Sequence, residues 1–384
     1  TIYTMNRKYI LAVMFMMVTA LSLPVSAQDQ WKDTDGNYIN AHGGCVLQHE
    51  GTYYWFGEHR PAEGFSTQAG VNCYASANLK EWKHLGIALQ VSEEAGSDIE
   101  RGCIMERPKV IYNSKTRKFV MWFHLELKGQ GYGPARTAVA VSERPEGPYH
   151  FIRSGRVNPG KWPLNLPKDA RKKNWEDKKY QEWWTPDWHN AVEQGMLIQR
   201  DRKGGQMSRD MTLFVDDDGN AYHIYSSEEN LTLHIAELSA DYLSHSGRYI
   251  RIFPGGHNEA PALFKKGETY WMITSGCTGW NPNAARMFSA PSIWGPWEQH
   301  PNPCRGEGAE KTFGGQSTYV LELPGEHFIF MADIWKPASL MYSGYLWLPI
   351  RFDEAGLPVL EQDRRCTKCV NGTCPKNKQW MIFR

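Results

Sequence analysis

Five segments of the chain each open with a polar residue that stands directly before a short apolar strand. These residues are His42, Glu106, Asp210, Glu259 and Gln316, and each segment continues through a turn into a second, aromatic-rich strand. Three carboxylates, an amide and an imidazole at one place could exchange protons with a bound molecule and hydrogen-bond its hydroxyl groups. We therefore expect acid–base chemistry on a polar substrate, provided that the fold brings these residues together.

The spacing of the five segments indicates how the fold does this. Their first residues lie 64, 104, 49 and 57 positions apart (42 to 106, 106 to 210, 210 to 259 and 259 to 316). An all-β repeat of roughly 50 residues is typical of a β-propeller, in which every blade presents its innermost strand to a central axis. The sequence thus predicts an all-β, five-bladed β-propeller that forms a single domain over residues 28–384.

The long second interval indicates an insertion at about residues 156–206. This stretch is rich in Lys, Trp and Pro, and it lacks the alternation of apolar and polar residues that strands show. Long loops on a rigid scaffold often carry function. Two interpretations remain open, a lid or rim to the site and a surface excursion that covers a blade edge.

Composition excludes some classes of partner. The 43 Lys and Arg residues balance 42 Asp and Glu residues, so the chain lacks the basic excess of a nucleic-acid-binding protein. The chain is rich in aromatic residues, which either pack the sheets or, near the five polar positions, could stack on sugar rings.

The start of the chain has the features of a secretory signal. Met5 is a plausible initiator after residues 1–4, Arg7 and Lys8 are basic, and an apolar stretch ends in the small residues Val25-Ser26-Ala27. We predict a signal peptide over residues 1–27, cleaved before Gln28, and export to the periplasm or the outside. The apolar stretch is too short for a comfortable membrane span.

Eight cysteines in an exported protein permit disulfides. Five are scattered, and three crowd the tail in CTKCVNGTC; in sequence order they are Cys45, Cys73, Cys103, Cys277, Cys304, Cys366, Cys369 and Cys374. A zinc site in the tail would need a fourth ligand, and no His lies nearby. We expect a tail disulfide or free thiols in this segment rather than a zinc site.

Several motifs occur in the order found in one enzyme family. They are MERPKVIYN, SRDMTLFVDDDG, NEAPALFK, SGCTGWNPN, FGGQSTYV and YLWLPIRF, spread between about residue 38 and residue 353. On these motifs the chain resembles glycoside hydrolase family 43, in particular its branch of exo-β-1,3-galactanases. The family's five-bladed propeller agrees with the five repeats, and the family's usual mechanism is inverting.

The resemblance implies catalytic roles. Glu259, at the start of EAPALF, matches the general acid, which must have a raised pKa to stay protonated. The family's usual first-blade Asp base is replaced here by His42. The galactanase branch is thought to rely on a fifth-blade Gln, which is Gln316 here. An amide is a weak base, so Gln316 would need a relay or an imidic acid tautomer, or would only position the water. His42 remains the rival base because its ordinary pKa is about 6.5.

The remaining site residues also follow from the resemblance. Glu106 should orient the sugar and tune the acid, and Trp280 should stack on a sugar ring. The expected substrate-binding residues are Glu58, Tyr132, Asp210, Asn230, Thr278, Trp280 and His42, with Asp333 as a weaker candidate.

The resemblance implies an exo-acting inverting hydrolase that releases terminal galactose from β-1,3-galactan or related arabinogalactan side chains. Two alternatives stay open, an exo-furanosidase for galactofuranose or arabinofuranose and a non-catalytic glycan-binding propeller. The expected partner is an oligosaccharide or polysaccharide, bound by a monomer. No cofactor is expected to be required, although a structural calcium ion could lie near the axis.

Overall fold

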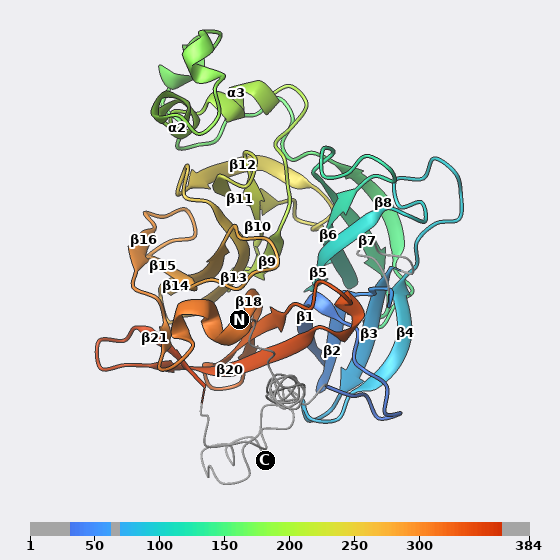
Figure 1. Cartoon of the computed structure of the whole chain (residues 1–384). Coiled ribbons are helices and arrows are strands. Elements are labelled where there is room, and N and C mark those ends of the chain that lie inside the picture. The colour runs from blue at the N-terminus through green and yellow to red at the C-terminus, as the bar shows by residue number, and fades with distance from the viewer. Residues whose placement is uncertain (1–30, 63–69, 363–384) are drawn as a thin grey trace, which may run out of the picture. The chain divides into compact units, whose positions relative to one another are not determined.

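A computed structural model describes residues 31–62 and 70–362, and these residues form five β-sheets arranged as a propeller (Figure 1). The predicted all-β, five-bladed fold is therefore confirmed. The predicted signal peptide over residues 1–27 and the cysteines at 366, 369 and 374 lie outside the described residues. Within the described ranges, no helix has the length and apolar character needed to span a bilayer.

Each blade takes its strands from one continuous part of the chain. The first blade is β1 (His42–His49), β2 (Thr52–Glu58), β3 (Val71–Ser76) and β4 (Lys83–Leu89). The second is β5 (Ile104–Asn113), β6 (Lys118–Glu126), β7 (Arg136–Ser142) and β8 (His150–Gly155). The third is β9 (Met211–Val215), β10 (Ala221–Ser227), β11 (Thr232–Leu238) and β12 (His245–Ile252).

The last two blades differ in their outer edges. The fourth is β13 (Asn258–Lys266), β14 (Thr269–Gly276), β15 (Arg286–Ala290) and β16 (Glu298–His300). The fifth has β18 (Gln316–Leu323), β19 (His327–Ile334), β20 (Gly344–Phe352), β21 (Pro358–Glu361) and a short parallel edge strand, β17 (Cys304–Arg305). The short helices η3 (Ala309–Gly314) and η4 (Leu340–Tyr342) connect strands around this blade.

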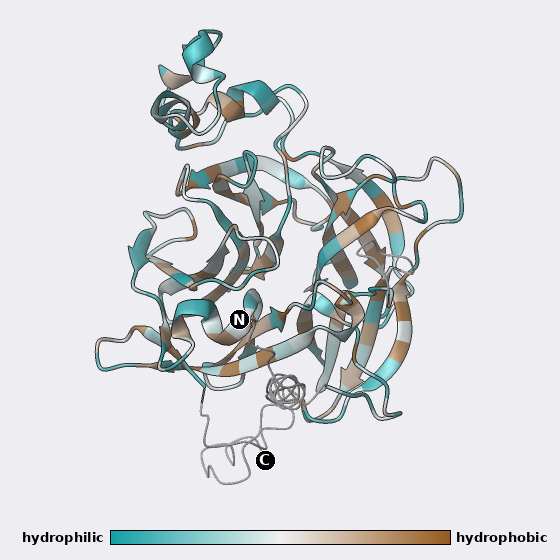
Figure 2. Ribbon diagram, viewed as in Figure 1, coloured by the Kyte–Doolittle hydropathy of each residue, from teal (hydrophilic) through white to brown (hydrophobic). Residues whose placement is uncertain are grey.

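The innermost strands β1, β5, β9, β13 and β18 contact one another in this order around the axis, and β18 returns to contact β1. A separate apolar core fills each of the five interfaces between neighbouring blades. Figure 2 shows the apolar residues concentrated on the strands, with mostly hydrophilic loops at the blade edges. Burial of these faces between sheets is the main driving force that holds the ring together.

Aromatic side chains close the ring between the first and fifth blades. Trp55 lies 4.7 Å from Tyr345 and 4.8 Å from Trp347 between ring centroids. Trp31 packs against Trp347 at 5.0 Å, and Trp82 packs against Trp55 at 5.2 Å. Among the described residues, each blade is built only from its own consecutive strands, and no strand from one end of the chain completes the blade at the other end. The aromatic contacts therefore join the first and last blades.

Backbone bulges turn the first residues of the inner strands toward the axis. The strand register shifts between His42 and Cys45, between Glu106 and Lys109, and between Glu259 and Ala262. The residue after each polar residue has a positive φ, 62° at Gly43, 55° at Arg107 and 52° at Ala260. A bulge bends its strand and re-aims a side chain. The repeated bulge therefore explains why the polar residues at equivalent positions converge.

Gly43 has a second, steric reason to be glycine. A Cβ atom there would lie 2.2 Å from Oε1 of Glu58, a contact that real Cβ atoms do not make. The glycine after His42 therefore leaves room for the Glu58 carboxylate.

The predicted insertion is a small helical lobe on the third blade (Figure 1). Its helices are η1 (Ala170–Lys172), η2 (Lys178–Tyr180), α2 (Pro186–Glu193) and α3 (Met196–Asp201). Thr185 caps α2 by accepting a hydrogen bond from the Trp188 N–H at 3.2 Å, and proline occupies the first turn, as helix starts favour. Buried Trp188 packs with Leu231 of the third blade.

A buried ion cluster anchors the lobe. Arg251 of β12 pairs with Glu228 at 2.6 Å and donates a hydrogen bond to the Val192 carbonyl of α2 at 2.8 Å. His234 completes the cluster, 2.9 Å from Glu228. The insertion is therefore fixed to its blade by charged hydrogen bonds as well as by apolar packing.

Candidate active site

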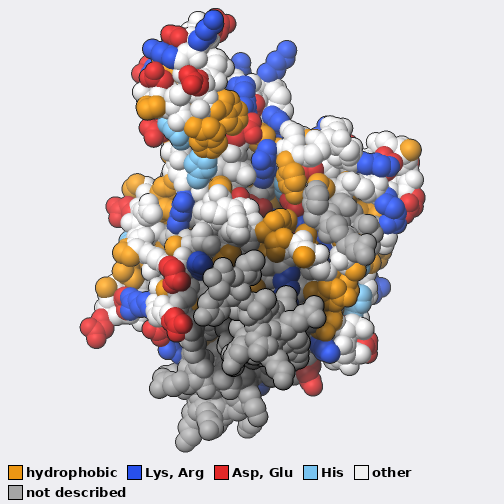
Figure 3. All heavy atoms as spheres, in the orientation of Figure 1, with side chains coloured by type: hydrophobic (Ala, Val, Ile, Leu, Met, Phe, Trp, Pro, Cys, Tyr) orange, Lys and Arg blue, Asp and Glu red, His pale blue; other side chains and the backbone are white. Residues whose placement is uncertain are grey.

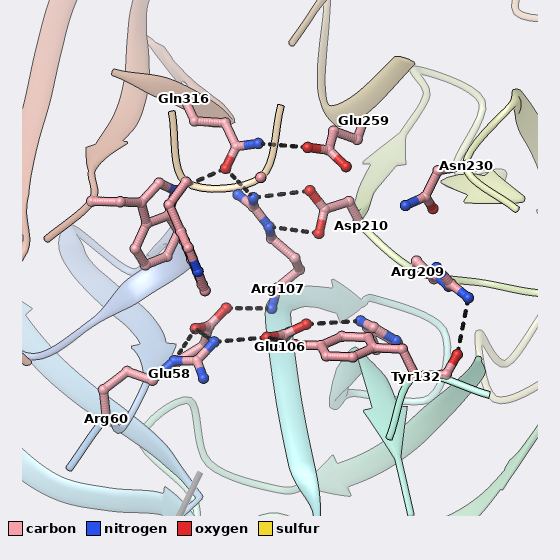
Figure 4. Close-up of a pocket in the computed structure, with 14 residues that line it drawn as sticks. Glu58, Arg60, Glu106, Arg107, Tyr132, Arg209, Asp210, Asn230, Glu259 and Gln316 are labelled. Carbon is pink, nitrogen blue, oxygen red and sulfur yellow. Dashed lines mark hydrogen bonds and ion pairs between the residues drawn. The ribbon is translucent and has the colours of Figure 1, made fainter. Parts of the chain in front are cut away.

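A pocket of about 190 Å³ opens where the inner strands converge. It is lined by Glu58, Arg60, Glu106, Arg107, His124, Tyr132, Arg209, Asp210, Asn230, Glu259, Gly279, Trp280, Gln316 and Trp335 (Figure 4). This volume is below the roughly 300–1,000 Å³ typical of sites for drug-sized ligands. The small volume suits a single small group, and the charged and amide side chains of the lining suit a group with many hydroxyls.

Eight of the ten predicted site residues line this pocket. They are Glu58, Glu106, Tyr132, Asp210, Asn230, Glu259, Trp280 and Gln316. They come from all five blades, so residues far apart in the sequence meet as the repeat pattern predicts.

His42 does not line the pocket, unlike the first residues of the other four segments. Its side chain is completely buried, stacks on the Tyr345 ring at 4.8 Å and lies 3.1 Å from the Ser343 carbonyl oxygen. Burial lowers the pKa of His42 to about 4. The repeat pattern placed its backbone correctly, but stacking on Tyr345 keeps the imidazole within the protein.

Thr278 is also absent from the pocket lining. Its hydroxyl accepts a hydrogen bond from the Asn283 amide at 2.7 Å, within the loop that carries Gly279 and Trp280. Thr278 therefore shapes the loop, and Trp280 is the member of this motif that reaches the pocket. Asp333, the weaker candidate, is buried and accepts a hydrogen bond from the Gly43 N–H at 3.0 Å.

Arg60 pairs with two carboxylates on one wall. Its Nη2 lies 2.6 Å from Glu58 and 2.9 Å from Glu106. Glu58 also accepts a hydrogen bond from the Arg107 N–H at 2.8 Å. Burial raises the pKa of Glu58 although Arg60 opposes this, so the guanidinium is what makes two neighbouring buried acids tolerable.

Glu106 is held in its ionised form. Burial alone would raise its pKa, but the adjacent His124 imidazole and the charge of Arg60 together lower the pKa. His124 lies 3.2 Å from Glu106 and 2.8 Å from Glu126. Burial opposes protonation of His124, but these two carboxylates raise its pKa to about 9. Tyr132 donates a hydrogen bond to Glu106 at 2.8 Å, so Glu106 is a fixed anion.

Arg107 joins the centre of the site. Its guanidinium contacts both carboxylate oxygens of Asp210, at 3.0 and 2.9 Å, and donates to Gln316 Oε1 at 2.7 Å. A bidentate arginine pair fixes both partners geometrically as well as electrostatically. Arg107 thereby sets the positions of Asp210 and Gln316 relative to each other (Figure 4).

Glu259 differs from the other acids of the pocket. Glu58, Glu106 and Asp210 each pair with an arginine, whereas Glu259 forms no ion pair among the described residues. Burial, followed by repulsion from Asp210, raises the pKa of Glu259 to about 8. Glu259 is therefore the carboxyl group of this pocket that can carry a proton at neutral pH.

Gln316 has its amide fully engaged. Oε1 accepts hydrogen bonds from Arg107 and from the Trp335 indole N–H at 2.8 Å, while Nε2 donates to Glu259 at 3.2 Å and to Ser275 at 3.1 Å. The orientation of the amide is therefore fixed, with its oxygen toward two donors and its nitrogen toward the acid.

Sequence reasoning missed several lining residues: Arg60, Arg107, His124, Arg209 and Trp335. Arg107 directly follows Glu106, and its positive φ turns its side chain into the pocket beside that of Glu106. No alternating strand pattern predicts this, because the bulge breaks the alternation. Arg60 stands two residues after Glu58, and this closeness in sequence could have predicted that the two side chains pair.

Among the described residues, no group of three or more His, Cys, Asp or Glu side chains is arranged to hold a metal ion. Calcium near the axis stays a prediction. The five described cysteines are free thiols, Cys45, Cys73, Cys103, Cys277 and Cys304.

Comparison with known proteins agrees with this geometry. The model of glycosyl hydrolases family 43 matches residues 171–330. A family 43 β-1,3-galactosidase solved with galactodeoxynojirimycin is 68% identical, with a TM-score of 0.87 over 88% of this chain and 98% of that one. No curated protein sequence matches the chain.

Two exo-β-1,3-galactanases are more distant. That of Phanerochaete chrysosporium, solved with β-1,3-galactotriose, is 31% identical with a TM-score of 0.68, over 86% of this chain and 65% of its own. That of Clostridium thermocellum is 34% identical with a TM-score of 0.68, over 86% of this chain and 63% of its own. On its motifs, its fold and these similarities, the chain belongs to glycoside hydrolase family 43.

Proposed function

We propose that this protein is an exo-acting, inverting glycoside hydrolase that releases terminal galactose from β-1,3-galactan or related arabinogalactan side chains. The observation that carries the proposal is the state of Glu259, a buried carboxyl group without an ion-pair partner among the described residues, whose pKa is raised to about 8. The small pocket fits one terminal sugar ring, which is what exo-action requires. The 68% identical relative is itself a β-1,3-galactosidase.

In this mechanism Glu259 donates its proton to the oxygen of the leaving group. Ionised Glu106, fixed by Arg60 and His124, accepts hydrogen bonds from sugar hydroxyls and keeps the ring in place. Asp210 does the same from the third blade and keeps the pKa of Glu259 high by repulsion. Trp280, whose side chain is 37% exposed, offers a face for the sugar or for the next residue of the chain.

Gln316 is the residue proposed to direct the attacking water. The two donors on its oxygen, Arg107 and Trp335, draw electron density toward that oxygen. As Glu259 gives its proton to the leaving group, Nε2 would pass one N–H proton to Glu259 along their hydrogen bond, and the imidate nitrogen that results would take a proton from the attacking water. Arg107 and Trp335 would stabilise the negative oxygen of this imidate, and the cycle ends with Glu259 protonated and Gln316 again an amide. His42 is the weaker candidate because it lies outside the pocket lining.

The decisive experiment uses Glu259→Gln with two kinds of substrate. Hydrolysis of β-1,3-galactan should be abolished, whereas an aryl galactoside with a good leaving group should lose less activity because it needs little protonation. NMR should show the α-anomer of galactose as the first product. Wild-type rates on galactan in Glu259→Gln would show that the acid is misassigned, and a β-anomer would exclude inversion.

The same assays separate the alternatives. A furanosidase would cleave aryl galactofuranoside or arabinofuranoside in preference to aryl galactopyranoside. A glycan-binding protein would bind galactan without releasing galactose. The identity with a β-1,3-galactosidase favours the first activity.

We also propose that the protein is exported after cleavage of residues 1–27, and that it acts as a monomer in the periplasm or outside the cell. The basic start, apolar stretch and small residues before Gln28 support export. Mass spectrometry of the native protein should find a mature start at or near Gln28. Retention of residues 5–27 would contradict this, and sedimentation would test the monomer.

A further inference from the structure

The helical insertion carries an aromatic pocket of its own, separate from the active site. This insertion pocket has a volume of about 320 Å³, and its walls include Trp175, Tyr180, Trp183, Trp188, Gln199 and Arg200. Trp183 stacks on buried Trp188 with ring centroids 5.0 Å apart and planes 28° apart. Four aromatic rings around one hollow give several flat apolar faces against which a ring-shaped ligand can lie.

Two residues of this pocket carry polar atoms without hydrogen-bond partners among the described residues. The indole N–H of Trp175 and the amide oxygen Oε1 of Gln199 are buried, and neither has a hydrogen-bond partner among the described residues. A buried polar group without a partner costs about 1–3 kcal/mol. One free donor and one free acceptor beside aromatic faces match a sugar, whose hydroxyls both accept and donate and whose C–H face is apolar.

The aromatic surface continues outside the pocket. The side chains of Trp183 and Trp184 are 47% and 59% exposed, and Figure 3 shows hydrophobic side chains gathered beside histidine side chains in this part of the surface. Trp184 has a φ of 71° and stacks on His257 at 5.3 Å. Such a φ is rare for a bulky residue, and residues held this way concentrate at binding sites.

Two connections relate this surface to the active site. His257, under Trp184, lies two residues before Glu259 in the chain. Arg200 of the insertion pocket lies 2.9 Å from Glu229, which lies 3.5 Å from Arg209 of the active-site lining. A row of three charged side chains thus separates the two pockets, and a branched or long glycan could contact both.

We propose that the insertion pocket is a second carbohydrate-binding site, which takes a galactosyl residue of the polymeric substrate other than the one being cleaved. The identity of the sugar rests on the proposed function. The site holds the polymer, so it contributes to affinity for long or branched substrate and not to the chemistry at the terminal residue.

The test compares two substrates in matched variants. Trp183→Ala removes a stacking wall, and Trp175→Phe removes the indole N–H while keeping an aromatic ring. Leu164→Ala is the control, because Leu164 is 53% exposed on the same insertion and does not line the pocket. An aryl galactoside reports on the active site alone, and β-1,3-galactan reports on both sites.

For Trp183→Ala we expect KM for galactan to rise about tenfold, the equivalent of one lost aromatic contact. For Trp175→Phe we expect a smaller rise, about threefold. For both variants kcat/KM on the aryl galactoside should stay within about twofold of wild type, and Leu164→Ala should match wild type on both substrates. Affinity electrophoresis in gels containing galactan, on a Glu259→Gln background, should show the same order of binding.

Unchanged KM for galactan in Trp183→Ala and Trp175→Phe would overturn the second site. Equal loss on both substrates would also overturn it, because the insertion would then only support the fold. Sedimentation that shows a dimer in wild type and a monomer in Trp183→Ala would assign the surface to self-association instead. If Trp183→Ala does not fold, Trp175→Phe decides. A wild-type protein that cleaves neither substrate would refute the proposed function, a result distinct from all of these.

Discussion

The amide nitrogen of Gln316 lies 3.2 Å from the carboxyl oxygen Oε1 of Glu259. In inverting glycosidases the acid and the base are usually roughly 6.5–9.5 Å apart, so that a water and the sugar fit between them. In this site the two groups touch instead, so the substrate must enter between them. The same contact links the protonation of Glu259 to the hydrogen bonding of Gln316.

Replacing Gln316 should separate positioning from base catalysis. We expect Gln316→Ala to lower kcat by about 10²–10⁴-fold, the usual range for general-base help. Gln316→Glu should place a carboxylate beside Glu259, raise the pKa of Glu259 further by repulsion, and move the alkaline limb of the pH–rate profile to higher pH. Near wild-type kcat in Gln316→Ala would remove Gln316 from the mechanism.

The pH profile should report the Glu259 proton. Since the acid must be protonated and its pKa is raised to about 8, kcat/KM should fall as pH rises through about 8. Asp210→Asn removes the repelling charge and leaves the charge of Arg107 without its bidentate partner. Both effects lower the pKa of Glu259, so the alkaline limb should move to lower pH. A limb that stays in place would mean that another group titrates there.

Much of the architecture could be predicted from the sequence, because it repeats. Five polar residues before five apolar strands gave the blade count and placed Glu106, Asp210, Glu259 and Gln316 in one pocket, which the structure confirms. The same alignment failed for His42, because it specifies where a backbone lies and not where a side chain points. The His42 ring packs on Tyr345 instead.

The charge network of the site could not be predicted in the same way. Arg107 owes its place to a bulge and a positive φ, and Arg60 to a short segment after β2. Neither feature has a periodic signal. In the sequence, the helical lobe appeared only as an interval without the alternation typical of strands. The Arg251–Glu228 pair that anchors it joins residues 23 positions apart, and no repeat in the sequence indicates that these two residues meet.

Arg107 should tolerate no substitution, including lysine. Lysine keeps the charge but cannot contact both oxygens of Asp210 and Gln316 at the same time. We expect both Arg107→Lys and Arg107→Ala to lower kcat/KM on an aryl galactoside by about 10²-fold or more, the scale of a misplaced catalytic group. Arg153→Lys is the control and should match wild type, because Arg153 lies outside the pocket lining and donates a hydrogen bond to the Ser244 hydroxyl at 2.6 Å. Wild-type activity in Arg107→Lys would show that only the positive charge at this position matters. Thermal denaturation of each variant should show that the variant is folded.

The last prediction concerns His42 and stability. Burial lowers the pKa of His42 from 6.5 to about 4, so between these values the unfolded chain binds a proton that the folded protein does not. The stability that depends on neutral His42 is fully present above pH 6.5. It is lost as pH falls toward 4, and the free energy of unfolding then decreases by about 3 kcal/mol.

His42→Gln keeps a donor for the Ser343 carbonyl and removes this titration. Other buried groups titrate in the same range, so the test is the difference between wild type and variant in urea unfolding at a series of pH values. We expect the stability of wild type relative to His42→Gln to fall by about 3 kcal/mol from pH 6.5 to pH 4.

The variant should keep kcat/KM at pH 6.5 within about threefold of wild type, because His42 is buried and outside the pocket lining. Exposed His150 in β8 gives the control, His150→Gln, which should parallel wild type. Parallel curves for His42→Gln and wild type would show that His42 is not held neutral, and an inactive His42→Gln with normal stability would return His42 to the reaction as a base.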